Sequence, residues 1–213
     1  VGNVYGGNLN NGITQNATIN ISGNSTISNL FGGGYQSDIG KSGTTGSTTL
    51  NIAGGTVSGI YGGSSNGIVY GNTNINIGKD AVTDSTLIAG NININDDIYG
   101  GGSINTQDYS ATSVYGETHI TLDNSKESPI TFNGSIFGSG NGSNYTQTGS
   151  KDGSTVKIKD FGTSTNSYNM VSIQRTGKVS IQNSYLELTG AQDKYNYYKN
   201  TSYTLNRVTN GLA

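Results

Sequence analysis

The chain has 213 residues, a formal net charge of −2, 34 glycines, one proline and neither cysteine nor tryptophan. The absence of cysteine excludes disulfides, thiolate metal sites and cysteine nucleophiles. Glycine, asparagine, serine and threonine fill more than half of the sequence and are poor or middling helix formers, which argues against a helical bundle. No apolar run approaches the roughly 18 residues of a membrane-spanning helix.

Short alternating segments recur along the chain, each with a polar residue between two aliphatic ones. This period of two is the pattern of a half-buried β-strand, with the aliphatic side chains facing a core and Asn, Thr or Lys facing outward. The eight segments cover residues 19–21, 50–52, 75–77, 92–94, 120–122, 156–158, 179–181 and 186–188.

A second motif, an aromatic residue followed by glycines, alternates with these strands. Its aromatic positions are spaced 26, 30, 38 and 38 residues apart. One such unit cannot bury its apolar face alone, whereas stacked units can, so the pattern is typical of a solenoid. The five positions are Tyr5, Phe31, Tyr61, Tyr99 and Phe137.

These two motifs together predict an all-β fold, a right-handed parallel β-helix without substantial helix. Glycine and asparagine suit the sharp corners of each coil, and the handedness follows from the strong bias of parallel β crossovers. At a coil spacing of about 4.8 Å we expect about 7–8 coils.

The last part of the chain differs from the first. Residues 1–150 carry 3 basic and 9 acidic side chains (3 − 9 = −6), and residues 151–213 carry 8 basic and 4 acidic (8 − 4 = +4). We predict coils with aromatic-Gly-Gly repeats over residues 1–162 and further, more basic coils over residues 163–213, truncated at the end. Because the chain starts and stops within a repeat, we expect it to be a piece of a longer polypeptide.

Several features bear on ligands. Neither part contains a run of like charge, so we expect no nucleic-acid partner and no membrane insertion in this segment. The five aromatic rings suit either sugar stacking or a packed ladder, and the exchange of Phe for Tyr favours packing.

The tyrosine-rich basic segment 193–199 suits protein or glycan contact, because rings offer area and a polar tip. Its candidate contacts are Lys194, Tyr195, Tyr197, Tyr198 and Lys199.

The repeats resemble a known class of proteins. The hydrophobic-Tyr-Gly-Gly units, the Thr-X-Asn-Ile strands and the segment Tyr203-Thr204-Leu205-Asn206-Arg207-Val208 are similar to pectate-lyase-like β-helix regions of cell-surface proteins of Gram-positive Firmicutes. The resemblance implies a secreted or wall-associated adhesin, in which a rigid stalk presents a non-catalytic binding surface to a host or environmental glycan or protein. We expect such a segment to be monomeric.

The alternative is a polysaccharide lyase or glycoside hydrolase with a groove along one sheet. Glycosidic bond cleavage needs carboxylates that face each other across the sugar, and the sequence shows no specific sign of them. An enzyme would require at least three of six residues to converge, namely Asp38, Asp96, Asp97, His119, Asp123 and Lys126. We predict no catalytic, cofactor-binding or metal-binding residues and no cofactor. An adventitious Ca²⁺ near Asp96, Asp97 or Asp123 stays open. A third possible role for the chain is that of a passive spacer. The outward positions lack the regular threonine grid of an ice-binding solenoid.

Overall fold

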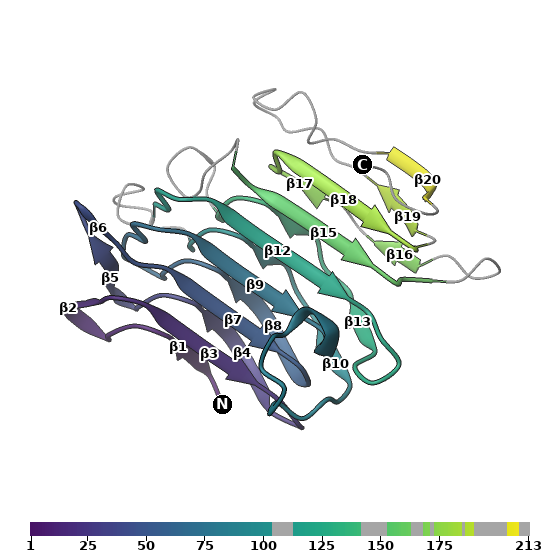
Figure 1. Ribbon diagram of the computed structural model, residues 1–213, viewed down its shortest axis with the longest axis horizontal. Helices are drawn as coiled ribbons and strands as arrows, with labels where there is room; N and C mark the ends of the chain where they lie inside the picture. The colour runs from purple at the N-terminus through teal and green to yellow at the C-terminus, as the bar shows by residue number, and fades with distance from the viewer. Residues whose placement is uncertain are drawn as a thin grey trace.

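The computed structural model describes residues 1–103, 113–141, 153–162, 168–170, 173–184, 186–189 and 204–208, and the fold is a parallel β-helix. The prediction from the repeats is therefore confirmed. The coils wind right-handed and stack in chain order from the N-terminal end (Figure 1). Within the described ranges, the helical structure is one short 3₁₀ turn, η1 (Lys79–Ala81).

One long sheet, here called the front sheet, faces the viewer in Figure 1. Neighbouring strands pair in parallel and in continuous register, so that each aliphatic residue stacks on another from coil to coil. The strands, in stacking order, are β3 (Ala17–Ile21), β7 (Thr48–Ile52), β9 (Thr73–Ile77), β12 (Thr118–Asp123), β15 (Thr155–Lys159) and β18 (Lys178–Gln182).

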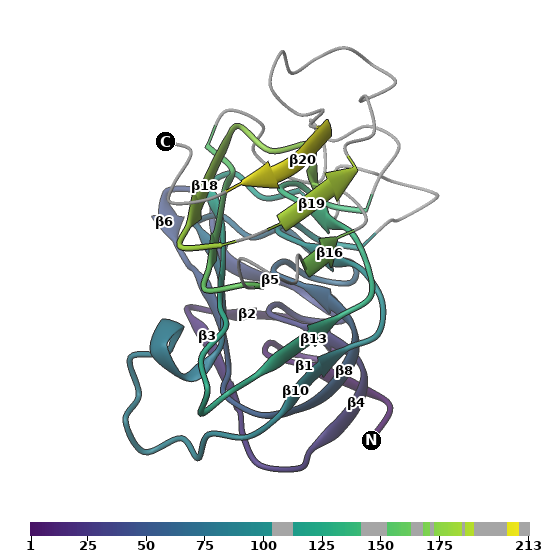
Figure 2. The same ribbon diagram turned by 90° about the vertical axis from the view of Figure 1, so that its right-hand side faces the viewer.

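The second long sheet, the back sheet, forms the opposite side of the coils (Figure 2). Its strands are also parallel and carry the aromatic positions at their ends. The strands along its main path are β1 (Asn3–Tyr5), β4 (Thr26–Phe31), β8 (Gly55–Tyr61), β11 (Ile98–Tyr99), β14 (Ile136–Phe137) and β17 (Ile173–Gln174), and β10 (Ile92–Ile94) pairs with both β8 and β13 (Ile130–Phe132).

A short third side closes each coil. It lies between the glycines that follow the aromatic residue of a back strand and the next front strand. It contains β2 (Asn10–Thr14), β5 (Gln36–Lys41) and β6 (Thr44–Thr45), followed by single-residue bridges that join Ile39 to Val69 and Val69 to Val114. The main core lies between the two long sheets and consists mostly of stacked Ile, Leu and Val. A smaller cluster of Ala17, Ile39, Val69 and Val114 fills the third side. A thin core thus suffices because each coil renews it.

The glycine after each aromatic residue is required by the approach of the next coil. A Cβ at Gly32, Gly62 or Gly100 would lie closer than 3.0 Å to a carbonyl oxygen of the following coil. The space beside the glycine holds a buried threonine, and the hydroxyl of Thr73 donates a 2.6 Å hydrogen bond to the Gly100 carbonyl. The aromatic-Gly motif therefore encodes close coil packing rather than a flexible linker.

The two long sheets continue past residue 162, because β14 pairs with β17 and β15 pairs with β18. Beyond them the pairing pattern changes. β16 (Tyr168–Met170) pairs in parallel with β19 (Leu186–Thr189), and β19 pairs antiparallel with β20 (Thr204–Val208). An antiparallel pair departs from the β-helix rule, and the repeat pattern of the sequence did not predict it.

Candidate binding surface

The outer surface of the front sheet is a regular polar surface, here called the polar face. The six strands share two outward positions, because successive side chains of a strand point to opposite faces, and β12, β15 and β18 add a third at their ends, with Asp123, Lys159 and Gln182. Register places the residues at the two shared positions in two columns along the stacking axis. One column is Thr18, Thr49, Asn74, His119, Thr155 and Lys178, and the other is Asn20, Asn51, Asn76, Thr121, Lys157 and Ser180.

Three asparagines of the second column form an amide ladder. The Asn76 Nδ2 donates to Asn51 Oδ1 at 2.9 Å, and the Asn51 Nδ2 donates to Asn20 Oδ1 at 2.9 Å. Both bonds run in the same direction, so each amide polarises the next. Asn51, in the middle of the ladder, is buried, so it orients Asn20 and Asn76, which are the amides that a ligand can reach. Side chains that are already oriented lose less entropy on binding.

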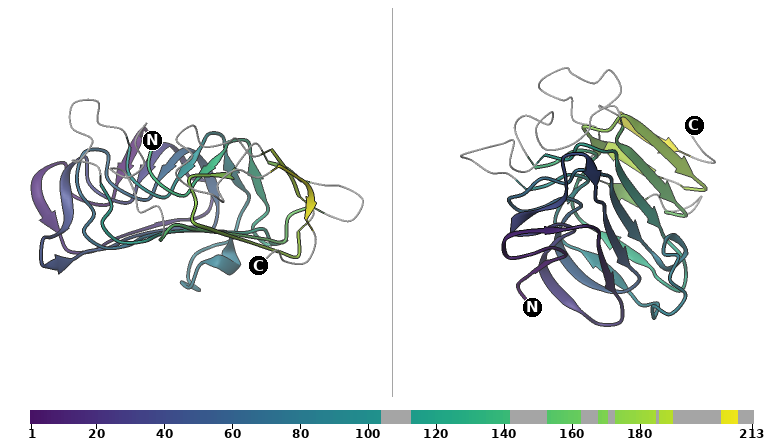
Figure 3. Two further views of the ribbon diagram at one scale, coloured as in Figure 1. Left: turned by 90° about the horizontal axis from the view of Figure 1, so that it is seen from above. Right: turned by 60° about the vertical axis from the view of Figure 1, so that its left-hand side comes forward.

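A loop over residues 78–91 stands out from the front sheet beside this ladder (Figure 3, left). The Lys79 Nζ ties it together by donating to the carbonyl oxygens of Asp84 at 3.2 Å and Leu87 at 2.6 Å. The Asp84 carboxylate accepts from Asn20 Nδ2 at 3.3 Å, which joins the loop to the first amide of the ladder. Hydrogen bonds from the Thr86 hydroxyl and backbone hold the pKa of Asp84 below its usual value. The loop forms a raised border on the polar face.

Within the two columns, the lysines lie on the C-terminal strands β15 and β18. β3, β7 and β9 present only Asn and Thr in the two columns, whereas β12, β15 and β18 add His119, Lys157 and Lys178. His119 Nε2 lies 3.2 Å from a carboxylate oxygen of Glu117. Lys157 and Lys178 are exposed. A ligand on this face therefore meets amides and hydroxyls bordered by the Asp84 carboxylate at one end and cationic lysines at the other.

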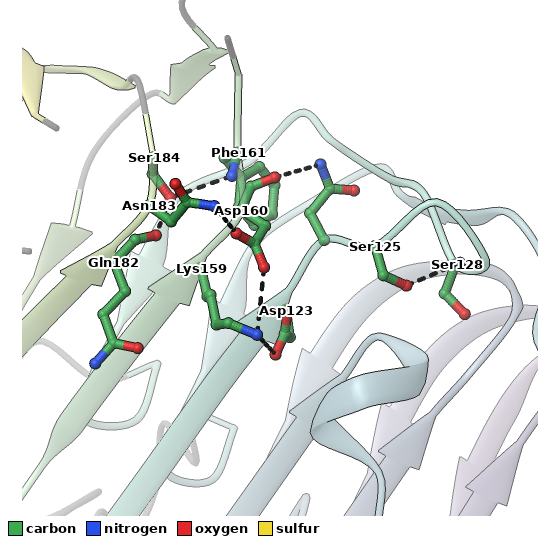
Figure 4. Close-up of polar contacts among 10 residues, drawn as sticks. Asp123, Ser125, Ser128, Lys159, Asp160, Phe161, Gln182, Asn183 and Ser184 are labelled. Atoms are coloured by element: carbon green, nitrogen blue, oxygen red, sulfur yellow. Dashed lines mark hydrogen bonds and ion pairs between the residues drawn. The ribbon is translucent and has the colours of Figure 1, made fainter. Parts of the chain in front are cut away.

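A charged corner lies where the front strands end (Figure 4). Lys159 Nζ lies 3.0 Å from Asp123 Oδ2 and 3.2 Å from Asp160 Oδ2. These two carboxylates raise the pKa of Lys159, with the hydrogen bond to Asp123 as the main cause. The Asp123 side chain is 9% exposed, and its Oδ1 has no hydrogen-bond partner among the described residues. The Lys159 side chain is 42% exposed. Because its cation is half in solvent, this pair contributes modestly to stability.

Neighbouring corner residues form a ladder of their own. Asn124 Nδ2 donates to the Asp160 carbonyl at 3.1 Å, and Asn183 Nδ2 donates to Asp160 Oδ1. Asp160 and Asn183 have φ values of 61° and 44°, a region that Asn and Asp tolerate better than other side chains. The polar groups of this corner thus serve the turn of the backbone.

The five aromatic side chains stack on one another along the outside of the back sheet. Each follows a core residue in its strand, so it leaves the opposite face. Consecutive ring centroids lie 5.0, 4.7, 5.1 and 4.8 Å apart, with interplanar angles of 8° to 11°. Both faces of each inner ring are therefore covered by neighbouring rings, which leaves no inner face for a sugar. The packed ladder, rather than sugar stacking, describes these residues.

The ends and edges of this stack are also occupied. Tyr35 packs edge-on against Tyr5 at 5.5 Å, and the Arg175 guanidinium lies 4.6 Å from the Phe137 ring centroid. The Tyr99 hydroxyl donates to Asp97 Oδ2 at 2.9 Å. Burial, followed by this contact with Asp97, raises the pKa of Tyr99 well above its usual value. Tyr99 is therefore a structural member of the stack whose hydroxyl resists ionisation.

The six residues that an enzyme would bring together lie on different parts of the coil. Asp38 is in β5 on the third side, and its Oδ1 accepts from the Ile68 N–H at 2.8 Å. Asp96 and Asp97 lie between β10 and β11 of the back sheet, and His119 and Asp123 lie at opposite ends of β12. Lys126 is exposed in the following segment. Among the described residues, no group of three or more His, Cys, Asp or Glu is placed to hold a metal ion.

The predicted ligand contacts Lys194, Tyr195, Tyr197, Tyr198 and Lys199 lie outside the described residues and stay a prediction. Sequence reasoning missed the raised loop, because its contact from Asp84 to Asn20 spans 64 residues and no motif marks it.

In the part of the chain that the structure describes, no helix is long and apolar enough to cross a membrane. Comparison with protein-family models, with curated proteins and with solved structures found no match for the chain.

Proposed function

We propose that the chain is a non-catalytic, surface-exposed β-helix segment of a bacterial adhesin, which acts as a rigid stalk and binds a glycan or protein through the polar face. The observation that carries the proposal is the register of the front sheet. Outward amides and hydroxyls recur at the coil spacing of about 4.8 Å, and the amide ladder holds them in place. Such a preformed row suits a ligand with many hydroxyl or amide groups.

The composition of the face favours reversible binding over chemistry. Its N-terminal half contains only Asn and Thr in the two columns, which offer donors and acceptors but no group with a perturbed pKa. The pKa of Lys159 rises in the corner, which keeps this amine protonated and unsuited to act as a base. The location on a bacterial cell surface rests on the resemblance of the repeats alone.

The test compares two matched pairs of residues. Asn76 and Thr121 are register neighbours on the polar face, and Asn93 and Thr131 are register neighbours on the back sheet. The double variant Asn76→Ala/Thr121→Ala is to be compared with Asn93→Ala/Thr131→Ala on a glycan array and on mucin, at several protein concentrations. If two hydrogen bonds to a ligand are lost, binding to the arrayed glycans or to mucin weakens about tenfold in the first variant only.

Other outcomes would contradict the proposal. Equal loss in both variants would place binding elsewhere, and blank arrays at every concentration would favour a passive spacer. Release of reducing ends or unsaturated products from any polysaccharide would favour the lyase or hydrolase alternative.

A further inference from the structure

The chain contains three Asn-Gly pairs in which the structure describes both residues, and they differ in packing. The pairs are Asn11-Gly12, Asn66-Gly67 and Asn133-Gly134. Asn-Gly is the dipeptide in which a side-chain amide is most easily attacked by the next backbone nitrogen, because glycine has no side chain to hinder the approach. Whether attack occurs in a folded protein depends on the freedom of those two residues.

Among the three described pairs, only Gly12 has no atom of another coil among the nearest neighbours of a Cβ built on it. Asn11 and Gly12 are both exposed, and the nearest atoms to a Cβ at Gly12 belong to the flexible side chain of Asn8. By contrast, Gly67 and Gly134 are buried, and a Cβ on either would meet a backbone carbonyl of another coil, that of Ser37 or Asp96, closer than 3.0 Å. The packing that holds these two glycines also resists the backbone rotation that attack requires.

The backbone at Asn11 is irregular as well. The pairing of β2 with β5 shifts register between Asn10 and Ile13, so Asn11 and Gly12 are the residues at the irregularity. Asn11 has a φ of 38°, outside the extended region that a regular strand adopts. A register shift disrupts the ladder locally and leaves the inserted residues less constrained. The first coil thus combines the reactive dipeptide with exposure and local freedom.

We infer that Asn11-Gly12 is a site of spontaneous deamidation and the first of the three described Asn-Gly pairs to react. The Gly12 nitrogen attacks Cγ of Asn11, the N–Cγ bond forms, and the Cγ–Nδ2 bond breaks. The amide nitrogen leaves as ammonia with the proton lost by the Gly12 nitrogen. Water then opens the succinimide at either carbonyl, which yields aspartate or isoaspartate.

The modification changes the first coil in two ways. It adds a negative charge close to β5, where Asp38 is the register partner of Ile13. The isoaspartate product also inserts a methylene group into the backbone of β2. Both changes weaken the pairing of β2 with β5 and expose the third-side cluster that Ile39 belongs to. The long sheets, which pair through other strands, keep their protection.

The experiment is to incubate the intact protein at mildly alkaline pH and follow each Asn-Gly pair by peptide mass spectrometry, with enzymatic methylation of isoaspartate as a second readout. In the folded protein we expect Asn11 to convert several times faster than Asn66 and Asn133. In denaturant the three rates converge, because packing no longer distinguishes them. The variant Asn11→Gln loses the early product, and Gly12→Ala slows it in both states.

Hydrogen exchange of the aged protein supplies a structural readout, with increased exchange in β2 and β5 and unchanged exchange in β7 and β9. The inference is overturned if Asn66 or Asn133 converts as fast as Asn11 in the folded protein. It is equally overturned if Asn11 reacts only in denaturant.

Discussion

The glycine that follows each aromatic residue offers the sharpest test of how the coils pack, and Gly62 is the best placed. A Cβ at Gly62 would lie 3.0 Å from the Thr73 Cβ and closer than that to the Gly100 carbonyl oxygen. The deficit relative to van der Waals contact with this oxygen is about 1 Å. The nearest atom is the backbone oxygen of Gly100, which cannot move aside as a flexible side chain would, so Gly62→Ala must push two coils apart.

The cost follows from what that separation disturbs. Overpacking a well-filled site costs about 1–3 kcal/mol. The shift also stretches two hydrogen bonds. The Gly62 nitrogen donates to the Tyr99 carbonyl oxygen at 2.9 Å, and the Thr73 hydroxyl donates to the Gly100 carbonyl oxygen at 2.6 Å. Weakening one such bond adds about 1 kcal/mol. We therefore expect Gly62→Ala to lower the free energy of unfolding by about 2–4 kcal/mol.

Gly90→Ala is the control, because a Cβ there would have no neighbour closer than 3.6 Å and the backbone is not left-handed. Its expected effect is within about 1 kcal/mol of zero. Chemical denaturation followed by tyrosine fluorescence, which tryptophan does not mask in this chain, gives both values. Equal stabilities of the two variants would refute the account of the aromatic-Gly motif.

Three further predictions concern named contacts. Thr73→Val keeps the shape of the side chain but removes its hydroxyl bond to the Gly100 carbonyl, so stability measured by denaturant unfolding falls by about 1–3 kcal/mol; an unchanged midpoint would contradict this. Asp123→Asn weakens the ion pair with the half-exposed Lys159 and costs about 1 kcal/mol at neutral pH, and this cost shrinks in high salt if the pair is electrostatic. The raised pKa of Tyr99 means that, above about pH 10, the unfolded chain loses a proton that the folded chain retains, so stability falls as pH rises. Lys159, whose pKa is also raised, loses its stabilising charge in the same alkaline range. Tyr99→Phe is expected to make the fall of stability with pH less steep. Identical curves of stability against alkaline pH for the variant and the parent chain would exclude the tyrosine contribution.

The fold could be predicted from the sequence because a solenoid repeats the same local decision in every coil. The alternation in Ile75-Asn76-Ile77 determines which side chains face the core, and stacking of equivalent coils then sets the register without further information. The exchange of Phe31 for Tyr at an equivalent position indicated packing, and the rings do stack.

Features that depend on contacts between unlike segments could not be predicted. The loop over residues 78–91 reaches the polar face through Asp84 and Asn20, and periodicity does not determine where such a loop folds. The burial of Asp123 depends on Lys159 of the next coil, so an isolated acidic residue in the sequence reveals neither its partner nor its exposure. The antiparallel pairing of β20 with β19 breaks the repeat on which the prediction rested.

The most direct test of the central claim is amide chemical-shift mapping of the 22.1 kDa chain with a ligand selected on the glycan array. We predict that the shifted resonances cluster on β3, β7, β9 and β12 of the polar face and on the loop over residues 78–91. Shifts confined to residues 193–199, to the aromatic stack or to the back sheet would contradict the assignment of the polar face as the binding surface.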